Sequence, residues 1–74
     1  MIKECLDPIF IGYSLYATVK NKTLKLTQIK SAKASEGGRV TFETKNSTYL
    51  AEFTGPKYRA DFIADCKAMG VWDE

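Results

Sequence analysis

The sequence predicts an α+β fold, a four-stranded antiparallel meander with one C-terminal helix packed on one face. Apolar residues alternate at a spacing of two through most of residues 9 to 53, and a single segment with helical spacing follows them. Clusters of turn residues separate the alternating segments. With 74 residues and a mass of 8.3 kDa, the chain is expected to form one small domain over residues 1 to 74.

Residues 9 to 19 are expected to form the first strand, with the odd-numbered positions from Ile9 to Val19 facing the core. The opposite face then carries Phe10 and Tyr16, where a solvated strand would carry charges. The two aromatic rings either pack against a curled part of the sheet or anchor a protein partner or a second copy of the chain.

The second strand is expected within residues 23 to 32, after a tight turn at Asn21. A β-bulge near Thr27 or Gln28 would bring its three large aliphatic residues to the core side, and these are Leu24, Leu26 and Ile29.

The third and fourth strands are expected within residues 39 to 45 and 48 to 53, separated by a turn at Asn46 and Ser47. Their alternation predicts an inward face made of Val40, Phe42, Thr44, Tyr49, Ala51 and Phe53.

The helix is predicted from about Pro56 to Met69. Proline is favoured at the first helical position, Thr54 or Gly55 can cap the start, and Gly70 is a typical stop residue. The helical spacing predicts that its apolar side chains pack on the sheet. The contacts expected are those of Tyr58, Phe62 and Met69 with Ile11, Leu15, Phe42 and Phe53.

Strands followed by one C-terminal helix, with LTQIKSA leading into GGRVTFETK, resemble the last part of bacterial pleckstrin-homology-like modules. The resemblance covers roughly residues 24 to 69. The chain is expected to be too short for a full seven-stranded barrel, and the resemblance assigns a function to no residue.

The composition argues against catalysis and against a metal or cofactor site. The chain has no histidine, which removes the commonest general base and the commonest metal ligand. Cys5 and Cys66 are too far apart for a CxxC site, and Cys66 lies on the apolar side of the predicted helix, where it is expected to be a small core residue. The sequence therefore predicts a protein that is not an enzyme and that holds no cofactor.

The sparse cysteines favour a reducing, cytoplasmic setting. The N-terminal segment lacks the pattern of a signal peptide, and no stretch approaches the roughly 20 apolar residues that span a bilayer. The start at Met1 and the lack of a linker favour a complete small open reading frame.

A run of lysines without an acidic residue is the strongest functional signal. Residues 1 to 34 have a charge balance of +4, and residues 35 to 74 have a balance of −2. The lysines could steer phosphates or an acidic protein surface, or they could protect an exposed strand edge from pairing. The run consists of Lys20, Lys22, Lys25, Lys30 and Lys33.

Arg59 interrupts the apolar side of the predicted helix. It either extends past the edge of the sheet into solvent or binds a carboxylate or phosphate. Asp61 and Asp65, one turn apart, are interpreted as solvated surface groups.

These observations favour a non-catalytic protein-binding module, a small regulator or inhibitor that covers part of a larger protein. Phage or mobile-element proteins that block host defence belong to that class. The predicted binding residues are Phe10, Tyr16, the five lysines and Arg59. The alternative is a nucleic-acid-binding domain that uses the segment from Lys20 to Lys33, and a homodimer also stays open.

Overall fold

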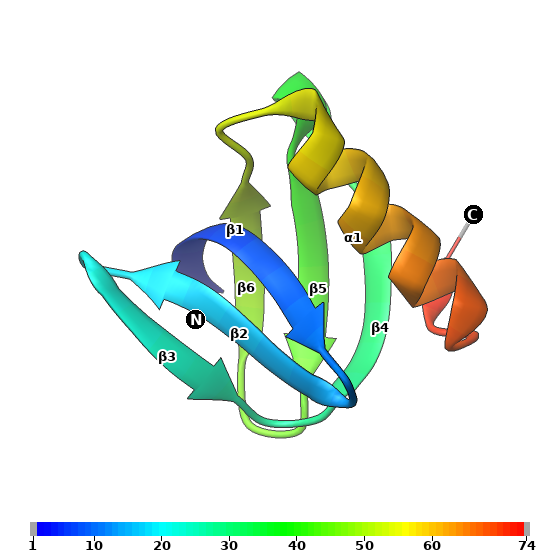
Figure 1. Ribbon diagram of the computed structural model, residues 1–74, viewed down its shortest axis with the longest axis horizontal. Helices are drawn as coiled ribbons and strands as arrows, with labels where there is room; N and C mark the ends of the chain where they lie inside the picture. The colour runs from blue at the N-terminus through cyan, green and yellow to red at the C-terminus, as the bar shows by residue number, and fades with distance from the viewer. Residues whose placement is uncertain (1, 74) are drawn as a thin grey trace.

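The computed structural model describes residues 2–73 as seven strands and one α-helix, which confirms the α+β class (Figure 1). A 3₁₀ turn, Glu36–Gly38, lies between two of the strands. The elements are β1 (Ile2–Ile11), β2 (Ser14–Val19), β3 (Lys22–Leu26), β4 (Ile29–Ala34), β5 (Val40–Thr44), β6 (Thr48–Glu52), α1 (Pro56–Ala68) and β7 (Trp72–Asp73).

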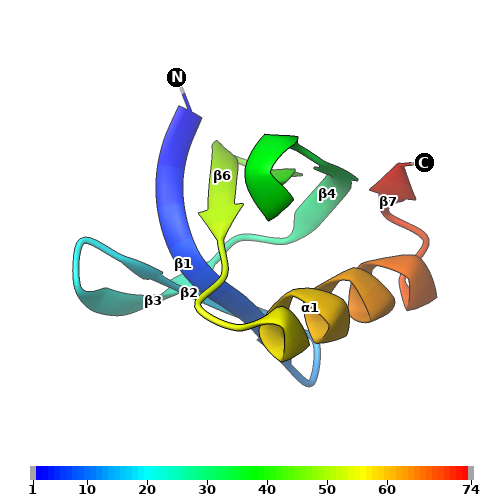
Figure 2. The same ribbon diagram turned by 90° about the horizontal axis from the view of Figure 1, so that it is seen from above.

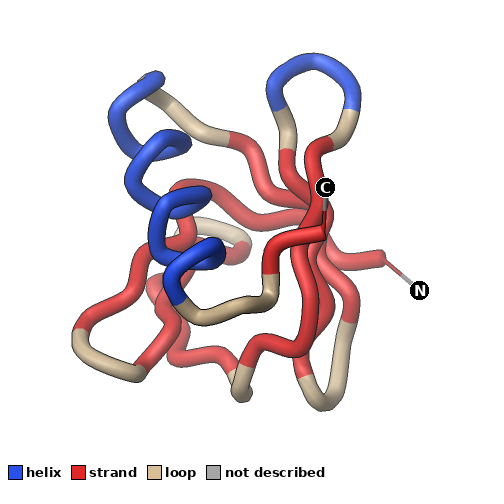
Figure 3. The backbone as a smooth tube through the Cα atoms, turned by 90° about the vertical axis from the view of Figure 1, so that its right-hand side faces the viewer, coloured by secondary structure: helices blue, strands red, loops and turns tan. Residues whose placement is uncertain are grey.

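The seven strands form one mixed sheet in the order β3-β2-β1-β6-β5-β4-β7. The pairs β1–β2, β2–β3, β4–β5 and β5–β6 are antiparallel, whereas β1 pairs with β6 and β4 pairs with β7 in parallel. The sheet curls, and α1 lies along one side of it, as Figure 2 and Figure 3 show. The prediction of a four-stranded antiparallel meander was therefore wrong.

Two of the predicted strands are each two strands in the structure. The first is divided by a turn at Gly12 and Tyr13, and the second is divided between Leu26 and Ile29, where a β-bulge was expected. Leu26 and Ile29 are both buried, but Leu24 is 43% exposed because it lies on the edge strand β3.

The two parallel pairings add the remaining strands. The N-terminal half of β1 pairs with β6 from Ile2 to Leu6, and the two-residue β7 pairs with β4. Because most of the strands have only five or six residues, the chain accommodates seven of them, in a sheet whose two end strands, β3 and β7, do not pair with each other.

The helix confirms the predicted boundaries. Gly55 precedes it as the N-cap, Pro56 occupies the first turn, and Gly70 follows it at φ +75°, a conformation that favours glycine. Only Phe62 and Cys66 of this helix are buried.

The core lies between the inner face of the sheet and α1. Phe62 is 1% exposed, and its ring centroid lies 5.5 Å from that of Phe42 and 5.8 Å from that of Phe53, as predicted. Tyr58 and Met69, which were expected to pack on the sheet, are 51% and 39% exposed. The buried residues of β5 and β6 include the predicted Val40, Phe42, Thr44, Tyr49 and Ala51.

Candidate protein-binding surface

The turn between β1 and β2 decides which apolar side chains face solvent. Gly12 adopts φ +65°, and the two-residue turn sets Ile11 opposite Ser14. Paired residues of two antiparallel strands share a face, so the alternation of odd and even positions reverses between β1 and β2. Leu15 and Ala17 face the core as predicted, whereas Ile9 and Ile11 are 41% and 62% exposed.

Phe10 lies on the inner side of the sheet, contrary to the prediction. It pairs with the buried Leu15, and its ring stacks on Phe62 with the centroids 5.5 Å apart and the planes within 8°. This half-buried side chain packs against the core. Of the two aromatic residues expected on the outer face, only Tyr16 is there, because it pairs with Ile9.

A bulge in β1 extends the exposed apolar surface. Leu6 and Ile9 are three positions apart and would face opposite sides of a regular strand, but the pairing of β1 with β2 is interrupted between them. Asp7 takes φ +46° here, and its two carboxylate oxygens accept hydrogen bonds of 2.8 Å from the backbone N–H and the hydroxyl of Thr54. Both Leu6, which pairs with Thr18, and Ile9 therefore face outward.

We call this surface the outer stripe, which consists of Leu6, Ile9, Ile11 and Tyr16. Tyr13, at the turn where the stripe ends, is 98% exposed. Ile9 and Ile11 were predicted to face the core, because residues 9 to 19 were expected to form one strand, and Leu6 lay outside the predicted strands. The available signal was Gly12, since glycine at the first central position is typical of a two-residue hairpin turn.

Charges of opposite sign lie on the two sides of the stripe. On one side Lys25 of the edge strand β3 pairs with Tyr16 and is exposed. On the other side, the exposed Asp61 and Asp65 of α1 line a cavity of about 380 Å³ together with Ile9. The apolar stripe is thus bordered by a cation and by two carboxylates.

The five lysines do not form one row in the sheet. Lys20 lies in the turn after β2 and Lys22 and Lys25 lie on β3, whereas Lys30 and Lys33 lie on β4. All five are exposed, and four strands stand between β3 and β4 in the sheet order. Whether any of them binds a partner stays a prediction.

Arg59 makes a contact within the protein. Its Nε donates a hydrogen bond of 2.8 Å to the carbonyl oxygen of Gly38, and its side chain is half-buried. This contact joins α1 to the 3₁₀ turn, where Gly37 and Gly38 have φ of 70° and 76°. The arrangement accounts for an arginine on this side of the helix without an external ligand.

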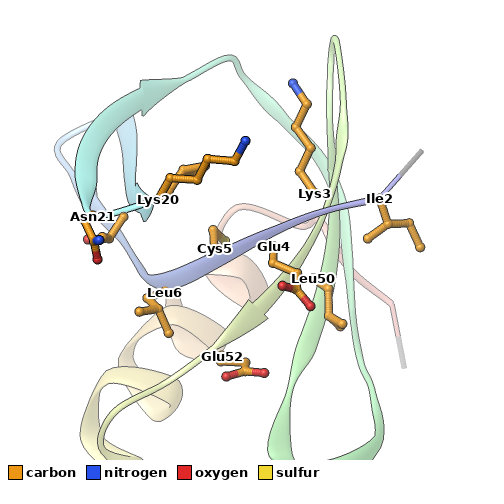
Figure 4. Close-up of a pocket in the computed structure, with 11 residues that line it drawn as sticks. Ile2, Lys3, Glu4, Cys5, Leu6, Lys20, Asn21, Leu50 and Glu52 are labelled. Carbon is orange, nitrogen blue, oxygen red and sulfur yellow. The ribbon is translucent and has the colours of Figure 1, made fainter.

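A larger cleft of about 1030 Å³ opens between the N-terminal half of β1 and the end of β2. Figure 4 shows Lys3 and Lys20 on one side of β1, and Glu4 and Glu52 on the other. Glu52 also forms a 3.1 Å ion pair with Arg39. Because the lining carries both signs of charge, it selects neither an anionic nor a cationic ligand.

The two cysteines are buried and are not joined by a disulfide. Burial raises the pKa of Cys5 from 9.0 to about 12, with a further contribution from the negative charge of Asp7. Burial raises the pKa of Cys66 from 9.0 to about 12 as well, with a contribution from Asp65. Both thiols are therefore protonated and poorly nucleophilic at neutral pH.

These pKa values predict a loss of stability in alkali. Between pH 9.0 and about 12 the unfolded chain releases two thiol protons that the folded chain retains, so the thiols' contribution is complete below pH 9.0 and declines above it. We expect the melting temperature to fall between about pH 9 and 12, measured by circular dichroism. The Cys5→Ala, Cys66→Ala variant should show a smaller fall, and an equal fall would contradict the prediction.

Within residues 2–73 no group of three or more histidine, cysteine, aspartate or glutamate side chains is arranged to hold a metal ion. No helix in the described part of the chain has the length and apolar character needed to cross a membrane. Comparison of the chain with protein-family models, with curated proteins and with solved structures finds no match.

Proposed function

We propose that the chain is a non-catalytic protein-binding module, a small regulator or inhibitor that covers part of a larger protein, and that it binds through the outer stripe. The observation that carries this proposal is the row of exposed aliphatic side chains along β1, at Leu6, Ile9 and Ile11, on the side of the strand away from the core. Adjoining apolar side chains exposed with a polar border are typical of protein interfaces.

The tyrosines support the same conclusion. Tyr16 is beside Ile9, and Tyr13 projects fully into solvent at the end of the hairpin. Tyrosine supplies a large apolar area and a hydroxyl that can hydrogen-bond at the border, which is why it is common among the residues that dominate binding energy. Phe10 has no place in this surface, since it packs against Phe62.

The nucleic-acid alternative receives less support. It required the lysines from Lys20 to Lys33 to act as one basic surface that follows a phosphate backbone. Their division between β3 and β4 leaves three near one end of the sheet order and two near the other. Protein binding is therefore the function that we advance.

Photo-crosslinking tests the proposal even while the partner is unidentified. A p-benzoylphenylalanine at position 11, in cells of the source organism, should give light-dependent adducts that contain a larger protein and that resist nuclease. The matched control places the same group at position 36, which is exposed in the 3₁₀ turn away from the stripe. Adducts that nuclease removes, or equal labelling from positions 11 and 36, would contradict the proposal.

A further inference from the structure

We propose that the outer stripe also binds a second copy of this chain, in a dimer whose two-fold axis runs along β1. The inference rests on the proposed function, because it assigns a particular protein to the same surface. The arrangement of charges across the stripe supports this assignment.

The order across the stripe is basic, apolar, acidic. Lys25 on β3 is next to Tyr16 on β2, Tyr16 is next to Ile9 on β1, and Asp61 and Asp65 on α1 share a cavity with Ile9. Neighbouring strands are about 4.8 Å apart, so Lys25 lies about 10 Å to one side of β1. The carboxylates lie on the opposite side, beyond the cavity.

Such an order is complementary to itself. A two-fold axis that lies in the interface and follows β1 turns the second copy face to face with the first and exchanges its two sides. Lys25 of each copy then faces Asp61 and Asp65 of the other, while Ile9 and Ile11 meet their counterparts near the axis. An axis perpendicular to β1 would instead set Lys25 against Lys25, which like-charge repulsion disfavours.

The surface area that a dimer interface must bury is consistent with the size of this protein. A standard interface buries about 800 Å² per partner, which is about one sixth of the 5106 Å² accessible surface of this chain. The dimer would cover the exposed aliphatic side chains of the stripe. A larger partner that uses the same stripe would have to displace the second copy, so the monomer would be the form that binds it.

Sedimentation equilibrium with charge-reversed variants tests the dimer. We expect wild-type protein to dimerise with rising concentration, and Lys25→Glu or the Asp61→Lys, Asp65→Lys variant to raise the dimer dissociation constant at least about tenfold. The triple variant Lys25→Glu, Asp61→Lys, Asp65→Lys should recover dimerisation, because the new carboxylate at position 25 then faces the two new ammonium groups of the other copy. Lys33→Glu is the matched control, since it makes the same charge change on β4.

Two sedimentation results would overturn the inference. One is a wild-type protein that remains monomeric at millimolar concentration, and the other is a dimer that responds to Lys25→Glu no more than to Lys33→Glu. Crosslinking from position 11 separates this failure from failure of the proposed function. With purified protein, adducts at twice the mass of the chain support the dimer. Their absence from purified protein, together with adducts to a larger protein in cells, overturns the dimer alone. The absence of adducts in both experiments overturns both proposals.

Discussion

Replacing Phe62 with alanine is expected to lower the free energy of unfolding by about 3–5 kcal/mol, the cost typical of a buried phenylalanine. Phe62 is 1% exposed, and its ring centroid lies 5.5 Å from those of Phe10 and Phe42 and 5.8 Å from that of Phe53. A chain of this length has a total stability of about 4–11 kcal/mol. The variant should therefore lose a large part of its stability, and urea denaturation at room temperature measures the loss.

The matched control for Phe62→Ala is Tyr58→Ala. Both residues lie on α1, but Tyr58 is 51% exposed and has far less apolar surface to lose from the core. We expect its cost to stay below about 1 kcal/mol. Equal costs for the two variants would show that the helix is not anchored through Phe62.

Phe10→Ala is expected to cost about 2 kcal/mol, less than Phe62→Ala because Phe10 is only half-buried. The loss comes from the stacked contact with Phe62 and from apolar area on the inner side of β1. Urea denaturation of the single variant measures this cost. This measurement distinguishes two roles of Phe10: a core residue, as the structure places it, and a partner-binding residue, as the sequence suggested.

Tyr13→Ala is the control for Phe10→Ala, because Tyr13 is 98% exposed and lies in the turn that follows the same strand. Its effect on stability should be within about 0.5 kcal/mol. If Phe10→Ala were equally neutral, the stacked ring pair would contribute nothing measurable, and the assignment of Phe10 to the core would fail.

The sequence predicted the local features of the fold well. The limits of α1 followed from Pro56 and Gly70, and the inward face of β5 and β6 followed from the alternation around Phe42. The turn at Asn21 is also present, with Lys20 and Asn21 both at positive φ. Each of these features depends on residues close together in the chain, where spacing and backbone preference are informative.

The predictions that failed have two causes, one that depends on distant parts of the chain and one that depends on a single local turn. No alternation can show that β1 pairs in parallel with β6, because that pairing joins Ile2 to Thr48. The two-residue turn at Gly12 then reversed the faces of Ile9 and Ile11, so an exposed apolar face was expected but its residues were misassigned. Of the two aromatic residues expected on the outer face, only Tyr16 lies there, and binding of a partner at this face stays a prediction.

β1 pairs with β2 along one edge and with β6 along the other, and this has a consequence for how the chain folds during synthesis. β1 is made first, but the strand that completes its pairing, β6, ends at Glu52. At roughly 5–20 residues per second, the intervening stretch of about 40 residues takes about 2–8 s to synthesise. During that interval nascent β1 has an open edge at Ile2 to Leu6, and Phe10 stays uncovered until α1 is also made. A chaperone or a neighbouring nascent chain therefore has its best opportunity to bind β1 before translation reaches β6.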